Sequence, residues 1–282
     1  MSRDARAPAT QRLDVVVALT AAFAWVSSAS FWWDLDAPVT SPRLWAAWAD
    51  PALLTRAPAT YAQLAVVVAS CVALVSGRAR VRAELALLVS LHLTAVLEMS
   101  VRGTPMSSVA PLLIGLVLAS RLAARAIAAR AGSAVDAEVL GHEIACGAVG
   151  AAFFIAAIAK LETSGLAWCS PASQTLLVYE RRESTIPLVG ALREWLVAHP
   201  SIVGASAGAS LLVESCGFAM LVPRLRIAWS SSALAMFVGL AIALGIVELT
   251  WMVLPSALAL LAPKAPAGEP SSRRQPTPKR AS

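Results

Sequence analysis

Apolar residues along the chain gather into blocks about as long as a membrane-spanning helix, and short polar connections separate the blocks. An α-helix needs about 20 mostly apolar residues to cross the hydrocarbon core of a bilayer. The pattern therefore predicts an all-α fold, a polytopic transmembrane helix bundle without a large soluble domain. The predicted spans lie near residues 13–33, 58–76, 83–101, 105–124, 139–161, 201–222 and 227–248.

A further apolar stretch at 249–262 is short for a complete span and contains Pro255. It predicts either an eighth, partly re-entrant helix or a continuation of the seventh. The bundle would then occupy residues 13–262, after a short N-terminal segment at 1–12. The tail at 263–282 is rich in Pro, Ser, Arg and Lys, which is typical of disordered segments.

Composition and charge support a membrane protein. The chain is 58% hydrophobic and 14% charged, against roughly 45–50% and about 25% in an average soluble domain. Its net charge of +6 would also suit nucleic acid. However, the arginines cluster between apolar blocks, as topology determinants do. We therefore expect a lipid bilayer, and no nucleic acid, as the partner.

Four clusters of arginine predict the orientation, because the loops of membrane proteins that carry excess Lys and Arg stay in the cytoplasm. The clusters occupy the N-terminus and the second, fourth and sixth connections (Arg3, Arg6, Arg12; Arg78, Arg80, Arg82; Arg121, Arg125, Arg130; Arg224, Arg226). We expect a multi-pass protein of the cell membrane with its N-terminus and basic tail in the cytoplasm. Outside, Trp45 and Trp48 could begin a short interfacial helix, and 186–199 has the spacing of an amphipathic helix that lies flat on the surface. The alternative, which we favour, is that both segments are ordinary amphipathic connectors.

Ionisable side chains within the predicted spans are candidate functional residues, because charge is costly inside a bilayer. They are Glu84, His92, Glu98, His142, Glu143, Lys160, Glu214 and Glu248. The three histidines of the chain are well separated and no zinc-binding spacing is present, so we expect no metal site. The four cysteines form no CxxC pair, which argues against a thiol redox centre.

Lys160 differs from the other cations. Residues 1–263 hold 17 arginines and this one lysine. Unlike arginine, a desolvated lysine can lose its proton near neutral pH and act as a base. The alternative is that Lys160 extends to the outer interface. Glu98 and Glu248 close the third and seventh spans at a similar depth, so these three residues form the predicted catalytic group.

The other candidates have simpler interpretations. His142 and Lys160 lie on one helix face but about 27 Å apart, so they cannot share a site. For His92 we favour a hydrogen-bonded structural role over a proton relay. For Glu214 we expect His142 or an arginine of the inner loops as partner.

The run from Ala151 to Leu161, followed by Trp168, resembles a signature of the vitamin K-dependent γ-carboxylase-like superfamily, also called horizontally transferred transmembrane (HTTM) domain proteins. In that family the fifth span ends in a small residue, Lys and Leu. The segment from Leu211 to Arg226 resembles the family's apolar helix with an embedded Glu and a Pro/Arg-rich turn.

Residues 245–261 resemble the last helix of the family, so the match covers about 139–262. The resemblance implies that Lys160 is the base that deprotonates a quinone-type cofactor. The family's large lumenal domain, which binds the protein substrate, is absent. The resemblance therefore implies a reduced relative that keeps the bundle and a quinone-type pocket.

Three functions stay open from the sequence. The first is a membrane enzyme in which Lys160 acts as general base on a quinone- or lipid-like small hydrophobic substrate at the outer leaflet. The second is a non-catalytic transport or assembly component with an unidentified protein partner. The third is a DoxX-like redox subunit, because DoxX-like families also have a helix that ends in a small residue, Lys and Leu.

Overall fold

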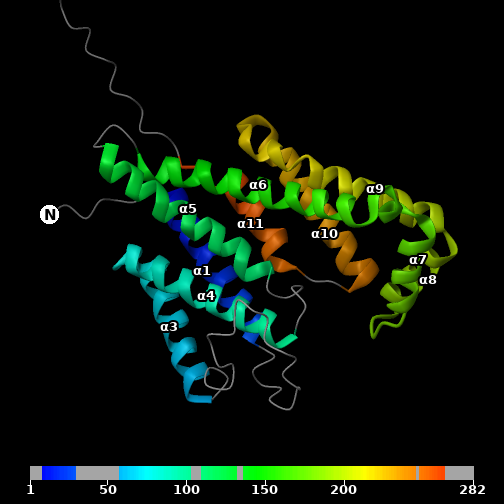
Figure 1. Ribbon diagram of the computed structural model, residues 1–282, viewed down its shortest axis with the longest axis horizontal. Coiled ribbons are helices and arrows are strands. Elements are labelled where there is room, and N and C mark those ends of the chain that lie inside the picture. Colours follow the sequence, from blue (N-terminus) through cyan, green and yellow to red (C-terminus); the bar gives the residue numbers. More distant parts are fainter. Residues whose placement is uncertain (1–7, 30–56, 103–108, 132–135, 246–247, 264–282) are drawn as a thin grey trace, which may run out of the picture.

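The computed structural model describes residues 8–29, 57–102, 109–131, 136–245 and 248–263, except for the side chains of residues 8, 28–29, 57–58, 97–102 and 109. These residues form α-helices and short 3-10 helices, and no strand occurs among them, which confirms the all-α fold (Figure 1). The elements are α1 (Pro8–Ala29), α3 (Ala57–Ser76), α4 (Arg80–Arg102), α5 (Val109–Ala131), α6 (Ala137–Ser164), η4 (Gly165–Cys169), α7 (Pro171–Glu180), α8 (Pro187–Ala198), α9 (Pro200–Ser215), η5 (Gly217–Leu221), α10 (Pro223–Leu244) and α11 (Leu249–Leu260).

Six helical segments are long and apolar enough to cross a membrane, which indicates a multi-pass membrane protein. They are Ala9–Ser27, Ala59–Ser76, Ala110–Ala131, Ala137–Cys169, Pro200–Leu221 and Pro223–Leu244. They match six of the seven predicted spans. The remaining predicted span corresponds to α4, whose 23 residues extend about 34 Å at about 1.5 Å per residue.

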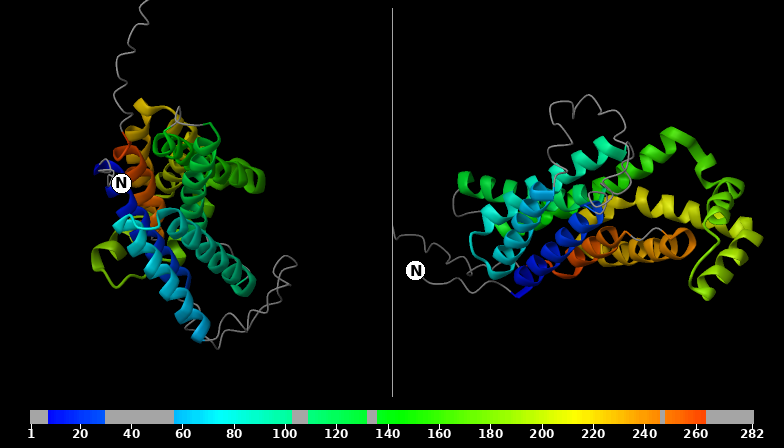
Figure 2. Two further views of the ribbon diagram at one scale, coloured as in Figure 1. Left: turned by 90° about the vertical axis from the view of Figure 1, so that its left-hand side faces the viewer. Right: turned by 90° about the horizontal axis from the view of Figure 1, so that it is seen from below.

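Helix α6 is the longest of the described helices, and it runs the length of the bundle (Figures 1 and 2). It begins at Asp136, whose carboxylate accepts hydrogen bonds from the amides of Glu138 and Val139 at 2.8 and 3.3 Å. It ends at Gly165, which has a φ of 56°. Its first half packs against α5, where Gly141 meets Arg121, and its second half packs against η5 and α9.

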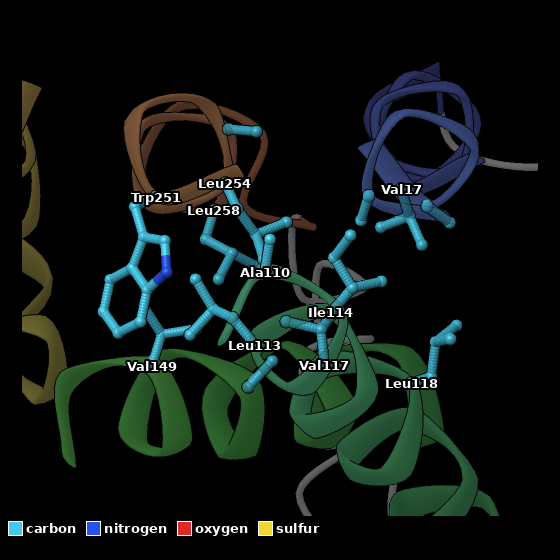
Figure 3. Close-up of a cluster of buried hydrophobic side chains, with 14 of the residues drawn as sticks. Val17, Ala110, Leu113, Ile114, Val117, Leu118, Val149, Trp251, Leu254 and Leu258 are labelled. Carbon is cyan, nitrogen blue, oxygen red and sulfur yellow. The ribbon is translucent and has the colours of Figure 1, made fainter. Parts of the chain in front are cut away.

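The core is apolar and lies between α1, α5, α6 and α11. Figure 3 shows Leu113 and Ile114 of α5 directed toward side chains of the neighbouring helices. Beside them, the ring of Phe153 on α6 meets the rings of Trp229 and Trp251 edge to face, at 4.8 and 4.7 Å between centroids. These contacts join α6 to α10 and α11 at mid-bundle.

Helix α11 is separate from α10, so the alternative of a continued seventh helix is wrong. Gly245, with a φ of 69°, ends α10 in a left-handed turn. The last helical residue is Leu244, four residues before the predicted limit of the span at 248. The 12 residues of α11 extend about 18 Å, less than the roughly 30 Å of a hydrocarbon core. At its end, Pro263 lines a small cavity with Thr10 of α1, so both ends of the described chain lie at one end of the bundle.

Two glycines let α6 and η5 approach closely. A Cβ atom on Gly150 would overlap the carbonyl oxygen of Gly217, and a Cβ atom on Gly217 would overlap that of Gly150. Small residues at such crossings allow close backbone packing, which is the main attraction between helices in lipid. The crossing therefore depends on glycine at both positions.

We expect Gly150→Ala to destabilise the fold by about 1–3 kcal/mol, because the added methyl group overpacks the crossing with Gly217. Thermal unfolding of the purified protein in detergent, followed by circular dichroism, measures the effect. Gly239→Ala on α10 is the matched control, because a Cβ atom there meets no heavy atom within 4 Å. Equal melting temperatures for the two variants would contradict the close crossing.

Candidate functional site

Charged residues gather at the end of the bundle where α6 begins, which we call the charged end. Three arginines and three acids from α1, α4, α5 and α6 form one ion-pair network there: Asp14, Arg80, Glu84, Arg121, Arg125 and Glu138. Asp14 and Glu84 are fully buried. Among the residues that the structure describes, the network has three cations and three anions, and such pairing offsets the cost of burying charge.

Each arginine of the network bridges acids from different helices. Arg80 contacts Asp14 at 2.9 Å and Glu138 at 2.7 Å. Arg121 contacts Asp14 and, at 3.1 Å, Glu84. Arg125 pairs with Glu84 and, at 3.3 Å, with Glu138. The guanidinium fork suits such bridging, because it donates in several directions at once.

The network corrects the placement of these arginines. We predicted them as residues of the connections, but Arg80 lies on α4, and Arg121 and Arg125 lie on α5. Their side chains are largely withdrawn from solvent. Asp14 and Glu138 were missed as members. Two features of the sequence could have indicated the network. Asp14 is a lone acid near the start of an apolar block, and Arg121 and Arg125 are four residues apart, as on one face of a helix.

Lys160 forms an ion pair with Glu214 of α9, whose side chain is 7% exposed. The direction of the helices explains the contact. The Cα–Cβ bond in a helix tilts toward the N-terminus, and α6 and α9 run in opposite directions (Figure 1). The two side chains therefore lean toward each other along the bundle. The ammonium also lies 5.3 Å from the ring centre of Trp168 on η4.

This pair differs from the predicted group. Among the described residues, Glu214 is the carboxylate that pairs with Lys160, so the expectation of His142 or an inner-loop arginine for Glu214 is wrong. Glu248 lies half-buried before α11 and forms no ion pair with Lys160. Burial raises the pKa of its carboxyl group. Glu98 lies on α4, and its side chain is outside the described residues.

The other intramembrane candidates have local partners. Glu143 pairs with Arg226 of α10, with 3.0 Å between Oε1 and Nη1. His142 is buried, and its Nε2 lies 3.6 Å from the sulfur of Cys146. The Nδ1 atom of His92 lies 3.0 Å from the carbonyl oxygen of Leu88, one turn earlier in α4. The contact at His92 fits the hydrogen-bonded role that we favoured for it.

A cavity of about 560 Å³ lies between α7, α8, α9 and α10, toward the end of the bundle that α7 and α8 occupy, which we call the hairpin end. Its walls are mainly apolar, with Gln174, Ser206, Ser210 and Ser232 as the polar residues and no charged side chain. The volume falls within the range of roughly 300–1,000 Å³ typical of small-molecule sites.

The ion pair of Lys160 is a neighbour of the cavity but not part of its wall. Val213, which precedes Glu214, lines the cavity, whereas Glu214 and Lys160 do not. Gln174 connects the two features, because it lines the cavity and donates a hydrogen bond to the carbonyl oxygen of Trp168 at 2.6 Å. The amine of Lys160 thus lies near residues of the cavity wall but does not itself line the cavity.

Arg193 holds together the helices at the hairpin end. Its side chain is buried and donates to the carbonyl oxygen of Ile242 at 2.8 Å and to those of Arg181 and Glu183 at 2.6 and 3.2 Å. The carbonyl groups of Ile242 and Arg181 lie at the ends of α10 and α7, where the helix dipole favours a cation, and that of Glu183 lies in the connection to α8. Arg193 therefore fixes the wall of the cavity that α8 provides.

Sequence reasoning missed this part of the structure. It predicted one helix at 186–199, which α8 confirms, but not α7. No group of three or more His, Cys, Asp or Glu side chains suitable for a metal ion occurs in the part of the chain that the structure describes. The helix predicted near Trp45 and Trp48 lies outside the described residues.

Comparison with models of known protein families, with curated protein sequences and with solved structures gives no significant match to this chain. The resemblance to the γ-carboxylase-like superfamily therefore stays a prediction.

We expect Glu84→Gln to destabilise the protein by about 3–5 kcal/mol, because removing one partner leaves Arg121 and Arg125 incompletely compensated. Unfolding in detergent measures the loss. Glu162→Gln, at an exposed position of α6, is the matched control and should change the stability little. Combining Glu84→Gln with Arg125→Met should recover part of the loss. A Glu84→Gln variant as stable as the control would exclude a structural role for the network.

Proposed function

We propose that this multi-pass membrane protein binds a hydrophobic small molecule or lipid chain in the cavity between α7, α8, α9 and α10. The observation that carries the proposal is an apolar cavity of about 560 Å³ bounded by two of the helices that are long enough to cross a membrane. Ligand sites of this kind combine apolar walls with a few polar groups that fix orientation.

The polar groups of the cavity favour a neutral ligand. The hydroxyl groups of Ser210 and Ser232 donate to carbonyl oxygens of their own helices, at 3.0 and 3.1 Å. Their lone pairs are left to accept a hydrogen bond, as from the hydroxyl group of an amphiphile. Because no cation lines the cavity, an anionic headgroup inside it would be buried without compensation.

Filling the cavity tests the proposal. The probe is a long-chain alcohol that carries a diazirine and an alkyne. It is photolysed in the presence of the protein in nanodiscs, and peptide mass spectrometry then maps the adducts. We expect adducts on the cavity-facing segments of α9 and α10. Gly239→Trp should reduce them by roughly tenfold, which corresponds to about 1.4 kcal/mol of binding free energy, because the indole occupies the space beside Gly239.

Leu234→Trp is the matched control. Leu234 also lies on α10, but it is exposed and does not line the cavity. Its adduct yield should equal that of the wild type. Equal yields in both tryptophan variants, or adducts confined to exposed faces of the bundle, would contradict a ligand site in the cavity.

A second candidate function is catalysis by Lys160 on a quinone- or lipid-like substrate, as the family resemblance implies. The observation in its favour is that two segments of the resemblance, 151–161 and 211–226, meet at the ion pair of Lys160 and Glu214. A general base needs a lone pair that is free to accept a proton, whereas Nζ of Lys160 donates to both carboxylate oxygens of Glu214. Separation of Lys160 from the cavity favours the non-catalytic alternative, a binding or assembly component of the membrane.

The reactivity of the amine distinguishes a structural lysine from a basic one. Acylation by a small, membrane-permeable anhydride requires the neutral amine, and mass spectrometry can follow Lys160 alone because the chain has three lysines. With a structural ion pair, we expect Lys160 to react slowly in the native protein compared with the SDS-unfolded protein. Glu214→Gln should accelerate the reaction by roughly tenfold, because it removes the compensating charge.

Lys160→Arg provides the second readout. A structural pair tolerates arginine, because the charge is kept, so the variant should melt within a few degrees of the wild type and bind the photoprobe equally. Fast acylation of native Lys160, unaffected by Glu214→Gln, would instead support its role as a base.

A further inference from the structure

The hairpin of α7 and α8 has an unusual distribution of side chains, because it buries two polar residues and exposes several large apolar ones. On α8, Leu188 is 79% exposed and Trp195 is 46% exposed, whereas Arg193 is 7% exposed. Leu188, Leu192 and Trp195 lie on one face, because they are separated by four and three residues. Leu188 and Trp195 are thus directed away from the protein, whereas Leu192 lies at the edge of this face and also lines the cavity.

Helix α7 shows the same feature. Gln174 is buried, whereas Leu176, Leu177 and Tyr179 are exposed. Exposed apolar patches of this extent are rare on soluble surfaces and mark contacts with a membrane or another protein. The buried polar residues of the hairpin have structural partners, since Arg193 and Gln174 bind backbone carbonyls. The exposed leucines and aromatic rings are therefore the part that needs a partner.

The patch is continuous with the apolar surface of the long helices. Exposed apolar side chains follow α6 at Ile155 and Ile158 and continue on η4 at Leu166, immediately before α7. On the other side of the hairpin, Ile202 begins the exposed apolar surface of α9. Because α6 and α9 are long enough to cross a membrane, the same lipid environment that covers them adjoins the hairpin.

The orientation and the aromatic residues indicate where in the lipid the hairpin lies. Helices α7 and α8 run across the end of α6 and α9 (Figures 1 and 2), so they lie along the membrane surface when α6 and α9 cross it. Arg182 lies 4.0 Å from the ring centre of Tyr179, and His199 stacks on Trp195 at 4.4 Å. Aromatic rings with polar neighbours are typical of the membrane–water interface.

We propose that the α7–α8 hairpin is a lipid-binding surface that lies in the interface of the bilayer, with Leu188 and Trp195 directed into the acyl chains. The occupant of the patch is lipid rather than a second copy of the chain, because the patch continues onto surfaces that lipid covers. The proposal is independent of the cavity, since neither Leu188 nor Trp195 lines it.

Site-directed spin labelling tests the environment of α8. The full-length protein, with Cys71, Cys146, Cys169 and Cys216 replaced by alanine, receives one label at Leu188→Cys and is reconstituted in phosphatidylcholine nanodiscs. Power saturation then measures collisions of the label with oxygen, which concentrates in lipid, and with a water-soluble nickel chelate. We expect high accessibility to oxygen and low accessibility to nickel, as for a label at Leu212→Cys on the exposed face of α9.

Glu194→Cys is the control on the same helix. Glu194 is exposed on a different face from Leu188, so its label should collide more often with the nickel chelate, by several fold. A label at Leu188 as accessible to nickel as that at Glu194 would place the hairpin in water and overturn the proposal. Low accessibility to both reagents would overturn it in favour of a protein partner, such as a second copy.

Discussion

Charged side chains can be kept inside this bundle only when they are paired, and this requirement determines which helices are neighbours. An uncompensated ion in a medium of low dielectric constant is costly. The network at the charged end joins α1, α4, α5 and α6. Lys160 joins α6 to α9, and Glu143 joins α6 to α10. Any arrangement that moved α6 away from these helices would leave at least one buried ion without its partner.

Away from these ion pairs, the packing of side chains rather than charge holds the helices together. Apolar burial provides little attraction between helices in lipid, so close contact decides the association. The glycine crossing of α6 and η5 and the aromatic cluster around Phe153 provide such contact. The cavity lies where the helices are no longer in close contact. Ala207, Ala235 and Gly239 are too small to fill the space between α9 and α10 there.

The sequence was sufficient to predict which segments form helices, but not which side chains pair between them. Apolar block length depends on local composition, so each long helix was predicted, although several limits were displaced. Helix α5 ends at Ala131 rather than at 124, and α10 runs from Pro223 to Leu244 rather than from 227 to 248, because the left-handed turn at Gly245 ends it early. Lys160 was identified by its rarity among arginines. Its partner was not, because Glu214 is 54 residues away and reaches it through the antiparallel packing of α6 and α9. Helix α7 was missed because it is short, with 10 residues, and because its buried positions are the polar Gln174 and the apolar Val178, which form no clear amphipathic pattern.

The length of α6 has a consequence for how firmly the position of this helix is set. The helix is anchored by Glu138 in its first turn and by Lys160 near its last, about 33 Å apart at about 1.5 Å per residue. A screw displacement by one residue combines a rise of about 1.5 Å with a rotation of about 100°, so it would separate both anchors from their partners at once. Two ion pairs at distant points of one rigid helix therefore fix both its height in the bundle and its rotation.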